Sequence, residues 1–265
     1  MFLNVTIPVY NEEAQIGPSV ARLLAVLGSL AGHRVEVVIA ENGSTDRTAE
    51  RGDALSRHDP RVRLVRLPQK GRGGALARAW RESQADVLTY MDVDLSTDLD
   101  AFPALIGPVI DGSFDLVTGS RLLRESRTTR GLFREVLSRG YSALARTTLK
   151  VPCRDLQCGF KAISRRAAHS LLPEVQDSAW FFDTELIYHA AKAGWRVKEI
   201  PVIWREDPDS RVRIVRTVID ALKGLARLRR RFGPLDGKLT VSGRRQGSPS
   251  GSKDPLKEPW TQTTE

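Results

Sequence analysis

Short apolar runs rich in β-branched residues alternate along the chain with longer segments whose apolar residues recur at helical spacing. The strand-like runs are Leu3–Val9, Val35–Ala40, Val62–Leu67, Val87–Met91 and Asp115–Thr118. Ile16–Leu30 and Arg47–Ser56 have helical spacing between these runs. This alternation predicts an α/β fold with right-handed β-α-β crossovers: a Rossmann-like, mostly parallel sheet with flanking helices.

Polar loops follow four of the predicted strands, at Tyr10, Asn42, Lys70 and Asp92. Ligands of such sheets bind beyond the carboxyl ends of the strands, so these loops are expected to meet at one crevice.

Two carboxylates separated by one residue, Asp92 and Asp94, stand at the end of the run Val87–Met91. Residues i and i+2 of a strand point to the same side, so both groups can converge on one point. A hard cation such as Mg²⁺ or Mn²⁺ would relieve their repulsion, and substrate phosphates would complete its coordination. A strand-end turn with solvated carboxylates is the simpler interpretation.

Positive charge is concentrated in two amphipathic segments, Arg127–Lys150 and Val215–Arg231. The chain has 41 Lys+Arg and 32 Asp+Glu, and residues 121–150 alone contain eight basic and two acidic residues. Such segments suit anionic partners: phosphates, a membrane surface or nucleic acid. Helices packed on the sheet with a solvated basic face explain the pattern equally well.

At 265 residues, the chain is long enough for one large domain with appendages. We expect a catalytic domain over residues 1–212, a basic amphipathic helix over 213–232 and a disordered tail over 233–265. The two cysteines, Cys153 and Cys158, fit no zinc or redox pattern and suggest a reducing compartment. Neither a signal peptide nor a membrane-spanning run is recognisable, so a cytoplasmic protein with peripheral membrane contact is expected.

Seven motifs in order resemble family 2 glycosyltransferases of the A-type fold, and within them the polyprenyl-phosphate or dolichyl-phosphate β-glucosyltransferase and mannosyltransferase branch. The resemblance covers roughly residues 3–212. The motifs are Pro8-Val9-Tyr10-Asn11-Glu12, Asn42-Gly43-Ser44-Thr45-Asp46, Lys70-Gly71-Arg72-Gly73-Gly74-Ala75, Asp92-Val93-Asp94-Leu95-Ser96, Gly119-Ser120-Arg121, Asp155-Leu156-Gln157-Cys158-Gly159-Phe160-Lys161 and Phe182-Asp183-Thr184-Glu185.

The resemblance implies a nucleotide-sugar site in which Tyr10 flanks the base and Glu12 accepts from ribose hydroxyls. The loop at Lys70 and Gly71 would let the backbone approach the phosphates at a helix N-terminus. The family usually has two Asp after the second strand; Glu41-Asn42 stand here, which leaves uracil or guanine open. The full predicted set is Pro8, Tyr10, Glu12, Glu41, Asn42, Lys70, Gly71, Asp92 and Gln157.

The resemblance also implies the catalytic residues and the acceptor site. Asp92 and Asp94 would hold the metal ion, and Asp183 and Glu185 would orient the donor sugar or serve as a base. Asp183 is an equally good helix N-cap. A lipid phosphate is already a nucleophile and needs positive charge rather than a base, whereas a hydroxyl acceptor needs a base. Arg121 is the first candidate for acceptor phosphate, followed by Arg134 and Lys161.

The sequence therefore predicts an inverting, Mg²⁺- or Mn²⁺-dependent transfer of a hexose from UDP-glucose or GDP-mannose to polyprenyl phosphate at the membrane surface. It leaves room for a membrane-protein partner. Three alternatives remain: a glycosyltransferase of the same fold with a soluble hydroxyl acceptor, a sugar nucleotidyltransferase and a basic nucleic-acid-binding protein. The nucleotidyltransferase should have its glycine-rich loop after the first strand, and nucleic-acid binding leaves Asp92 and Asp94 unexplained.

Overall fold

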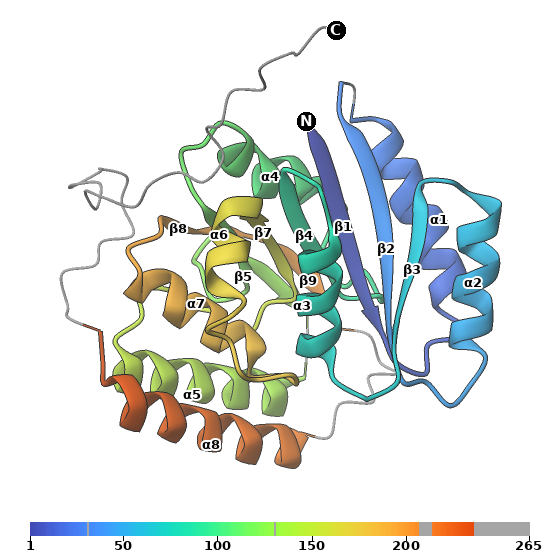
Figure 1. Ribbon diagram of the computed structural model, residues 1–265. Coiled ribbons are helices and arrows are strands. Elements are labelled where there is room, and N and C mark those ends of the chain that lie inside the picture. Colours follow the sequence, from blue (N-terminus) through green and yellow to red (C-terminus); the bar gives the residue numbers. More distant parts are fainter. Residues whose placement is uncertain (31, 130, 207–213, 236–265) are drawn as a thin grey trace, which may run out of the picture.

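A seven-stranded sheet with helices on both faces forms the centre of the molecule (Figure 1). The computed structural model describes residues 1–30, 32–129, 131–206 and 214–235, without the side chains of 132–134 and 214–217. The sheet order is β3-β2-β1-β4-β7-β5-β8. Its strands are β1 (Phe2–Val9), β2 (Arg34–Asn42), β3 (Val62–Leu67), β4 (Val87–Met91), β5 (Leu116–Ser120), β7 (Phe160–Ser164) and β8 (Val197–Pro201).

The helices cover both faces of this sheet. They are α1 (Ile16–Gly28), α2 (Thr48–His58), α3 (Arg72–Glu82), α4 (Phe102–Ile110), α5 (Leu132–Leu149), α6 (Arg165–Leu171), α7 (Phe182–Lys192) and α8 (Ile214–Phe232), with a 3-10 turn, η1 (Leu99–Ala101), before α4. The predicted α/β class and mostly parallel sheet are confirmed, because β1, β2, β3 and β4 pair in parallel and β5 pairs in parallel with β8.

Strand β7 is the antiparallel exception, and the hydrophobic pattern did not predict it. It lies between β4 and β5 and pairs with both. Its second residue is Lys161, whose charge disguises a strand that is buried on both faces. Because β7 runs against its neighbours, its first residue, Phe160, lies beside Met91 at the end of β4. The preceding loop therefore reaches the same edge of the sheet as Asp92.

The predicted helix over Arg127–Lys150 is wrong at its start. Residues Arg127–Thr129 form strand β6, which pairs in parallel with β9 (Ile203–Arg205) as a separate two-stranded sheet. Helix α5 begins only at Leu132. The predicted loop Arg205–Arg213 and tail 233–265 lie mostly outside the described residues.

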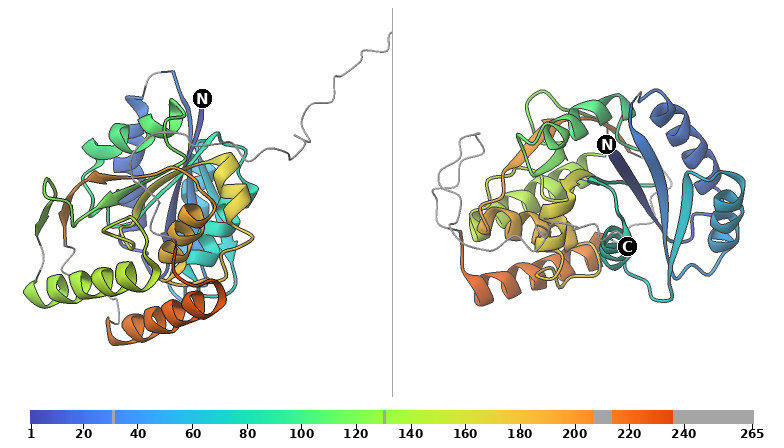
Figure 2. Two further views of the ribbon diagram at one scale, coloured as in Figure 1. Left: turned by 90° about the vertical axis from the view of Figure 1, so that its left-hand side faces the viewer. Right: turned by 45° about the horizontal axis from the view of Figure 1, so that its top comes forward.

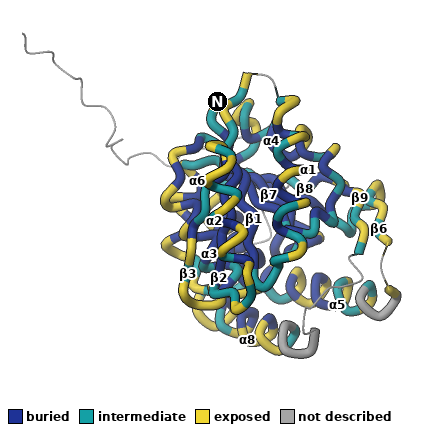
Figure 3. The backbone as a smooth tube through the Cα atoms, turned by 90° about the vertical axis from the view of Figure 1, so that its right-hand side faces the viewer, coloured by how far each residue is buried: buried dark blue, intermediate teal, exposed yellow. Residues whose placement is uncertain are grey.

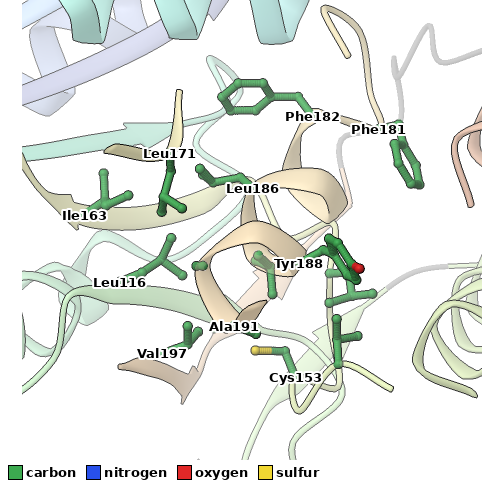
Figure 4. Packing of buried hydrophobic residues seen from close by; sticks show 14 of the residues in the cluster. Leu116, Cys153, Ile163, Leu171, Phe181, Phe182, Leu186, Tyr188, Ala191 and Val197 are labelled. Carbon is green, nitrogen blue, oxygen red and sulfur yellow. The ribbon is translucent and has the colours of Figure 1, made fainter. Parts of the chain in front are cut away.

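Two main apolar clusters hold the layers together. Residues of α1 and α4 pack on one face of the sheet, and residues of α3, α6 and α7 pack on the other. Helix α7 is almost wholly buried, and Figure 4 shows its Leu186, Tyr188 and Ala191 among strand residues such as Leu116 and Ile163. Burial decreases outward from the strands in Figure 3, where exposed positions follow the outer sides of the helices.

Helices α5 and α8 lie side by side as an outer layer beyond α7 (Figures 1 and 2). Gly224 of α8 allows close contact with α7, since a Cβ there would lie 2.5 Å from Cδ1 of Phe181. Within the described residues, no helix combines the length and apolar character needed to cross a bilayer.

Both cysteines are buried as free thiols. Cys153 belongs to the cluster around α7 (Figure 4), and Cys158 packs on the opposite face of the sheet. Burial raises the pKa of Cys158 to about 12 and that of Cys153 further still.

A pair of glycine substitutions tests the packing between α3 and α7. A Cβ added at Gly73 would lie 2.5 Å from Cβ of Phe182, whereas one at Gly140 in α5 would have no neighbour within 4 Å. We expect Gly73→Ala to lower the free energy of unfolding by about 1–3 kcal/mol through overpacking. Gly140→Ala should raise it by about 0.5–1 kcal/mol through helix propensity. Urea unfolding measures both, and equal effects of the two substitutions would contradict the close contact.

Candidate active site

The loops after the parallel strands meet at one edge of the sheet, and Asn42 connects two of them. The Asn42 side chain donates to the carbonyl oxygen of Val9 at 2.7 Å, and its Oδ1 accepts from the Gly71 N–H at 3.2 Å. Asn42 is 3% exposed and belongs to β2 rather than to the turn that was expected there. It therefore fixes the glycine-rich loop beside the end of β1.

Tyr10 and Lys70 form the more open part of this edge. The Lys70 ammonium lies 3.5 Å from the centroid of the half-buried Tyr10 ring. The backbone N–H of Glu12 donates to Thr48 Oγ1, which anchors the loop to α2. Pro8 is buried within β1, and Glu41 is 2% exposed and accepts from the Ser44 N–H. The roles of these residues toward a nucleotide stay predictions.

The glycine-rich loop packs against the segment that precedes α7. A Cβ at Gly71 would lie 2.7 Å from the carbonyl oxygen of Ser178, and the Gly74 N–H donates to that oxygen at 3.0 Å. The glycines therefore admit the segment before α7 to the edge of the sheet. The expected approach to phosphates at the N-terminus of α3 has to share this loop with Ser178.

Asp92 and Asp94 follow β4 in a turn, because the strand ends at Met91. Strand alternation therefore does not place their side chains, and the two carboxylates have different partners. Asp92 accepts from Arg72 Nη2 at 2.7 Å, while Asp94 accepts from the N–H and the hydroxyl of Ser96. Asp94 also borders a polar cavity of about 290 Å³ that Arg22 and Arg205 line.

The donor set at this turn fits a divalent ion that shares its coordination with substrate. The Asp92 side chain is 37% exposed, and carboxylate oxygens are ligands that Mg²⁺ and Mn²⁺ accept. Among the described residues, no cluster of three or more His, Cys, Asp or Glu side chains surrounds one point. An ion here would depend on one or two carboxylates and on phosphate oxygens, as Mg²⁺ commonly does.

Asp183 lies in the first turn of α7 and is the most heavily paired carboxylate of the site. It is 1% exposed and accepts from Arg72 Nη1 at 2.8 Å and from the Tyr90 hydroxyl. The Lys161 ammonium lies 3.0 Å from its Oδ1. Burial alone would raise the pKa of Asp183, but Lys161 and Arg72 outweigh it and hold that pKa below its ordinary value. Asp183 is therefore an ionised group bound from three elements.

Lys161 lies beneath this carboxylate. Its side chain is fully buried and donates to the Cys158 carbonyl oxygen at 2.6 Å. Its predicted contact with an acceptor phosphate would have to compete with Asp183. Burial and the Asp183 charge raise the pKa of Tyr90 far above its ordinary value, so the phenol stays protonated and donates.

Among the described residues, Glu185 has none of the partners of Asp183. It connects α7 to the segment before this helix and to α8. It accepts from the Asp177 N–H and from Arg227 Nη2 of α8, both at 2.8 Å. Its side chain is 1% exposed. The expected roles of Glu185 in sugar binding or base catalysis would require it to leave these partners.

Arg121 follows β5 and forms a two-pronged ion pair with the fully buried Asp155. Nε and Nη2 of Arg121 lie 2.7 and 2.9 Å from the two carboxylate oxygens. Burial opposes the charge on Asp155, but Arg121 lowers its pKa to about 2. The guanidinium lies 5.6 Å from the centroid of the Trp204 ring. Arg121 is therefore a fixed positive charge at the end of β5.

The remaining predicted residues are less defined. The Gln157 N–H donates to Asp155 Oδ1 at 3.1 Å, and its side chain is half-buried. Arg134 lies in the first turn of α5, and its side chain falls outside the described part of the chain.

Sequence reasoning missed Arg72, Tyr90 and Trp180. Arg72 stood inside the glycine-rich motif, where only Lys70 and the glycines were interpreted. Its guanidinium lies 4.9 Å from the ring centroids of both Tyr90 and Trp180. A basic residue between glycines, at the first position of a helix that begins at the acidic edge, was the available signal. Trp180 lies two residues before the motif Phe182–Glu185, and it is 41% exposed.

Comparisons with known proteins identify relatives of this chain. The chain is 40% identical over 219 residues to glycosyltransferase AglD of Haloferax volcanii. This match covers 82% of this chain but only 35% of AglD. It is 26% identical to dolichyl-phosphate beta-glucosyltransferase of Dictyostelium discoideum over 88% of this chain and 75% of that protein. This chain thus spans about a third of AglD and about three quarters of the second relative.

Among solved structures, glucosyl-3-phosphoglycerate synthase of Mycobacterium tuberculosis in complex with UDP superposes with a TM-score of 0.63. The two chains are 23% identical, and the match covers 89% of this chain and 81% of the other, which shows a common fold. The model of the family described as glycosyl transferase family 2 matches residues 4–172. The chain that carries this site belongs to glycosyl transferase family 2.

Proposed function

We propose that the protein transfers glucose from UDP-glucose to a polyprenyl phosphate, with inversion and with Mg²⁺ or Mn²⁺, at a membrane surface. GDP-mannose is the alternative donor. The name of the relative from Dictyostelium discoideum, a dolichyl-phosphate beta-glucosyltransferase, supports the glucosyl donor and the lipid phosphate acceptor.

The ion pairs of Asp183 and Glu185, the two candidate bases, are the observation that favours a phosphate acceptor over a hydroxyl acceptor. Lys161 and Arg72 hold the pKa of Asp183 below its ordinary value against the effect of burial. Burial likewise opposes ionisation of Glu185, but the neighbouring His189 imidazole, the hydrogen bond from the Asp177 N–H and the charge of Arg227 lower its pKa. A lowered pKa makes a carboxylate a weaker base, so neither group is suited to deprotonate a hydroxyl. A phosphate acceptor needs no such base.

The acceptor then requires a fixed positive charge, and Arg121 is the candidate. Asp155 orients its guanidinium through two hydrogen bonds, and the group is 14% exposed on its side-chain surface. Planar guanidinium groups bind phosphate through paired N–H donors, which suits both affinity and orientation.

Asp92 and Asp94 would hold the divalent ion beside the donor diphosphate. When bound, such an ion stabilises the negative charge that develops on the leaving nucleoside diphosphate. Tyr10 and Lys70 are stacked on each other at the same edge and would bind the nucleoside and its phosphates.

Helices α5 and α8 supply a surface suited to lipid headgroups. Both helices have exposed apolar side chains, Val136, Leu144, Ile219 and Leu222, and exposed basic ones, Arg139, Lys223, Arg229, Arg230 and Arg231. Basic amphipathic helices adsorb reversibly to anionic membranes. The same two helices contact α7, through Tyr141 with Thr184 and through Arg227 with Glu185. A membrane-bound acceptor would therefore approach close to Asp183.

The deciding experiment follows transfer of radiolabelled glucose from UDP-glucose into organic-extractable product. The reaction contains purified protein, Mn²⁺ or Mg²⁺ and a short polyprenyl phosphate, with Asp94→Ala run alongside. We expect acid-labile, metal-dependent lipid product, and at least about a hundredfold loss in the variant if Asp94 contributes several kcal/mol to the transition state. Equal transfer or hydrolysis without lipid would instead indicate a soluble hydroxyl acceptor.

Arg121→Gln tests the acceptor charge and has a pH signature. Removal of Arg121 leaves Asp155 buried and unpaired, which should lower the unfolding free energy at pH 7 by about 3–5 kcal/mol. In the wild type the pKa of Asp155 is about 2, below its ordinary 3.8, so the pair stabilises fully above the ordinary value and is lost as pH falls toward 2. In the variant Asp155 takes up its proton at higher pH, and the deficit should shrink at pH 4.

Arg196→Gln is the matched control, because Arg196 forms the same two-pronged pair with Asp115 at the other end of β5. It should also reduce stability, but transfer to lipid phosphate per folded molecule should fall only in Arg121→Gln. Equal transfer rates in the two variants would remove Arg121 from the acceptor site. Urea unfolding at pH 7 and pH 4 and the transfer assay provide the measurements.

Leu222→Asp combined with Ile219→Asp tests the membrane surface. These side chains are 44% and 47% exposed. Losing partial burial of two aliphatic side chains should cost roughly 1–2 kcal/mol, or about tenfold in binding to vesicles that contain phosphatidylglycerol. Ala54→Asp adds one acidic side chain on the exposed side of α2, away from α5 and α8 (Figure 1), and should bind like the wild type. Cosedimentation measures binding, and an unaffected double variant would exclude this surface.

A further inference from the structure

Arg72 holds together the two acidic groups at the centre of the site. Its Nη1 and Nη2 donate to Asp183 at 2.8 Å and to Asp92 at 2.7 Å, and its side chain is only 10% exposed. The rings of Tyr90 and Trp180 each lie with their centroids 4.9 Å from its Cζ. These contacts place a planar cation at the carboxylate that the proposed function assigns to a metal ion.

The charges of the four groups in direct contact balance without a divalent ion, while Asp94 accepts from Ser96 instead. Asp92 and Asp183 carry two negative charges, and Arg72 and Lys161 carry two positive ones, with Lys161 paired to Asp183 at 3.0 Å. A divalent ion at Asp92 would therefore meet the Arg72 guanidinium as a like charge at close range. Arg72 is only 10% exposed and Asp92 is 37% exposed, so water screens this repulsion only in part. Metal binding becomes favourable only when an anion accompanies the ion or Arg72 leaves Asp92.

Arg72 also has an unused donor. Its Nε is buried and has no hydrogen-bond partner among the described residues. A buried N–H without an acceptor is unfavourable, and a phosphate oxygen is a strong acceptor for guanidinium donors. Arg72 therefore competes with a metal cation for Asp92, and its Nε–H can donate to an anion such as a phosphate.

We propose that Arg72 is a positioning residue that couples metal binding to donor binding: it occupies Asp92 as a resident cation until the nucleoside diphosphate arrives. The diphosphate then provides Arg72 with a new partner, which frees Asp92 for the metal ion. The inference rests on the proposed metal-dependent use of a nucleotide sugar. By linkage, the factor by which UDP tightens Mn²⁺ binding equals the factor by which Mn²⁺ tightens UDP binding.

Mn²⁺ binding to the full chain, followed by electron paramagnetic resonance of free Mn²⁺ with and without UDP, tests this coupling. In the wild type, UDP should tighten Mn²⁺ binding by at least about tenfold, the scale of a typical coupling between two sites. In Arg72→Gln, Mn²⁺ should bind about tenfold more tightly without UDP than in the wild type, because one like charge is gone, and the effect of UDP should shrink correspondingly. Arg72→Lys, which keeps the charge, should retain most of the effect of UDP.

Arg78→Gln is the matched control. Arg78 lies on the same helix, α3, and forms an exposed ion pair with Glu82, so its loss should leave both Mn²⁺ affinities at the wild-type values. An unchanged effect of UDP in Arg72→Gln, or Mn²⁺ binding that weakens there without UDP, would overturn the role of Arg72 while leaving metal-dependent transfer intact.

Two further outcomes keep the test decisive. If Arg72→Gln does not fold, the wild type still decides, because equal Mn²⁺ affinity with and without UDP overturns the coupling. If the wild type binds no Mn²⁺ even with UDP, the role of Arg72 and the metal-dependent function fail together.

Discussion

The buried carboxylate of Asp183 is the constraint on which the site depends. An ionised group that is 1% exposed must be surrounded by donors and cations, and here three elements provide them. Tyr90 comes from β4, Lys161 from β7 and Arg72 from α3, while Asp183 itself comes from α7. The arrangement explains a lysine inside a central strand. It also brings the first turn of α7 close to the glycine-rich loop. This loop has glycines at the positions that Ser178 and Phe182 approach.

The first turn of α7 also connects the site to the outer layer. Thr184 shares a hydrogen bond with Tyr141 of α5, and Glu185 binds Arg227 of α8. Consecutive residues of one helical turn therefore face the acidic cluster and both outer helices. The position of the outer layer and the geometry of Asp183 are mechanically linked through these contacts.

The sequence was sufficient for β1 to β5, because buried strands and amphipathic helices have distinct periods, but it did not predict β8, which pairs in parallel with β5. It failed where a charge or a turn changed the pattern. Lys161 hid β7, since its partner Asp183 is distant in sequence, and pairing with β9 turned Arg127–Thr129 into a strand instead of helix. The motif residues were found as a set, but their partners were not. That Arg72 binds Asp92, and that Asp94 binds Ser96, depends on a turn conformation that no periodicity encodes.

The buried thiols have a practical consequence. Only a thiolate reacts readily with maleimides or disulfides, and burial raises the pKa of Cys158 to about 12 and that of Cys153 higher. The chain has two cysteines in all, so neither competes for a labelling reagent while the protein is folded. A single cysteine introduced on the outer side of α8 would accept a fluorophore or spin label without prior removal of native residues.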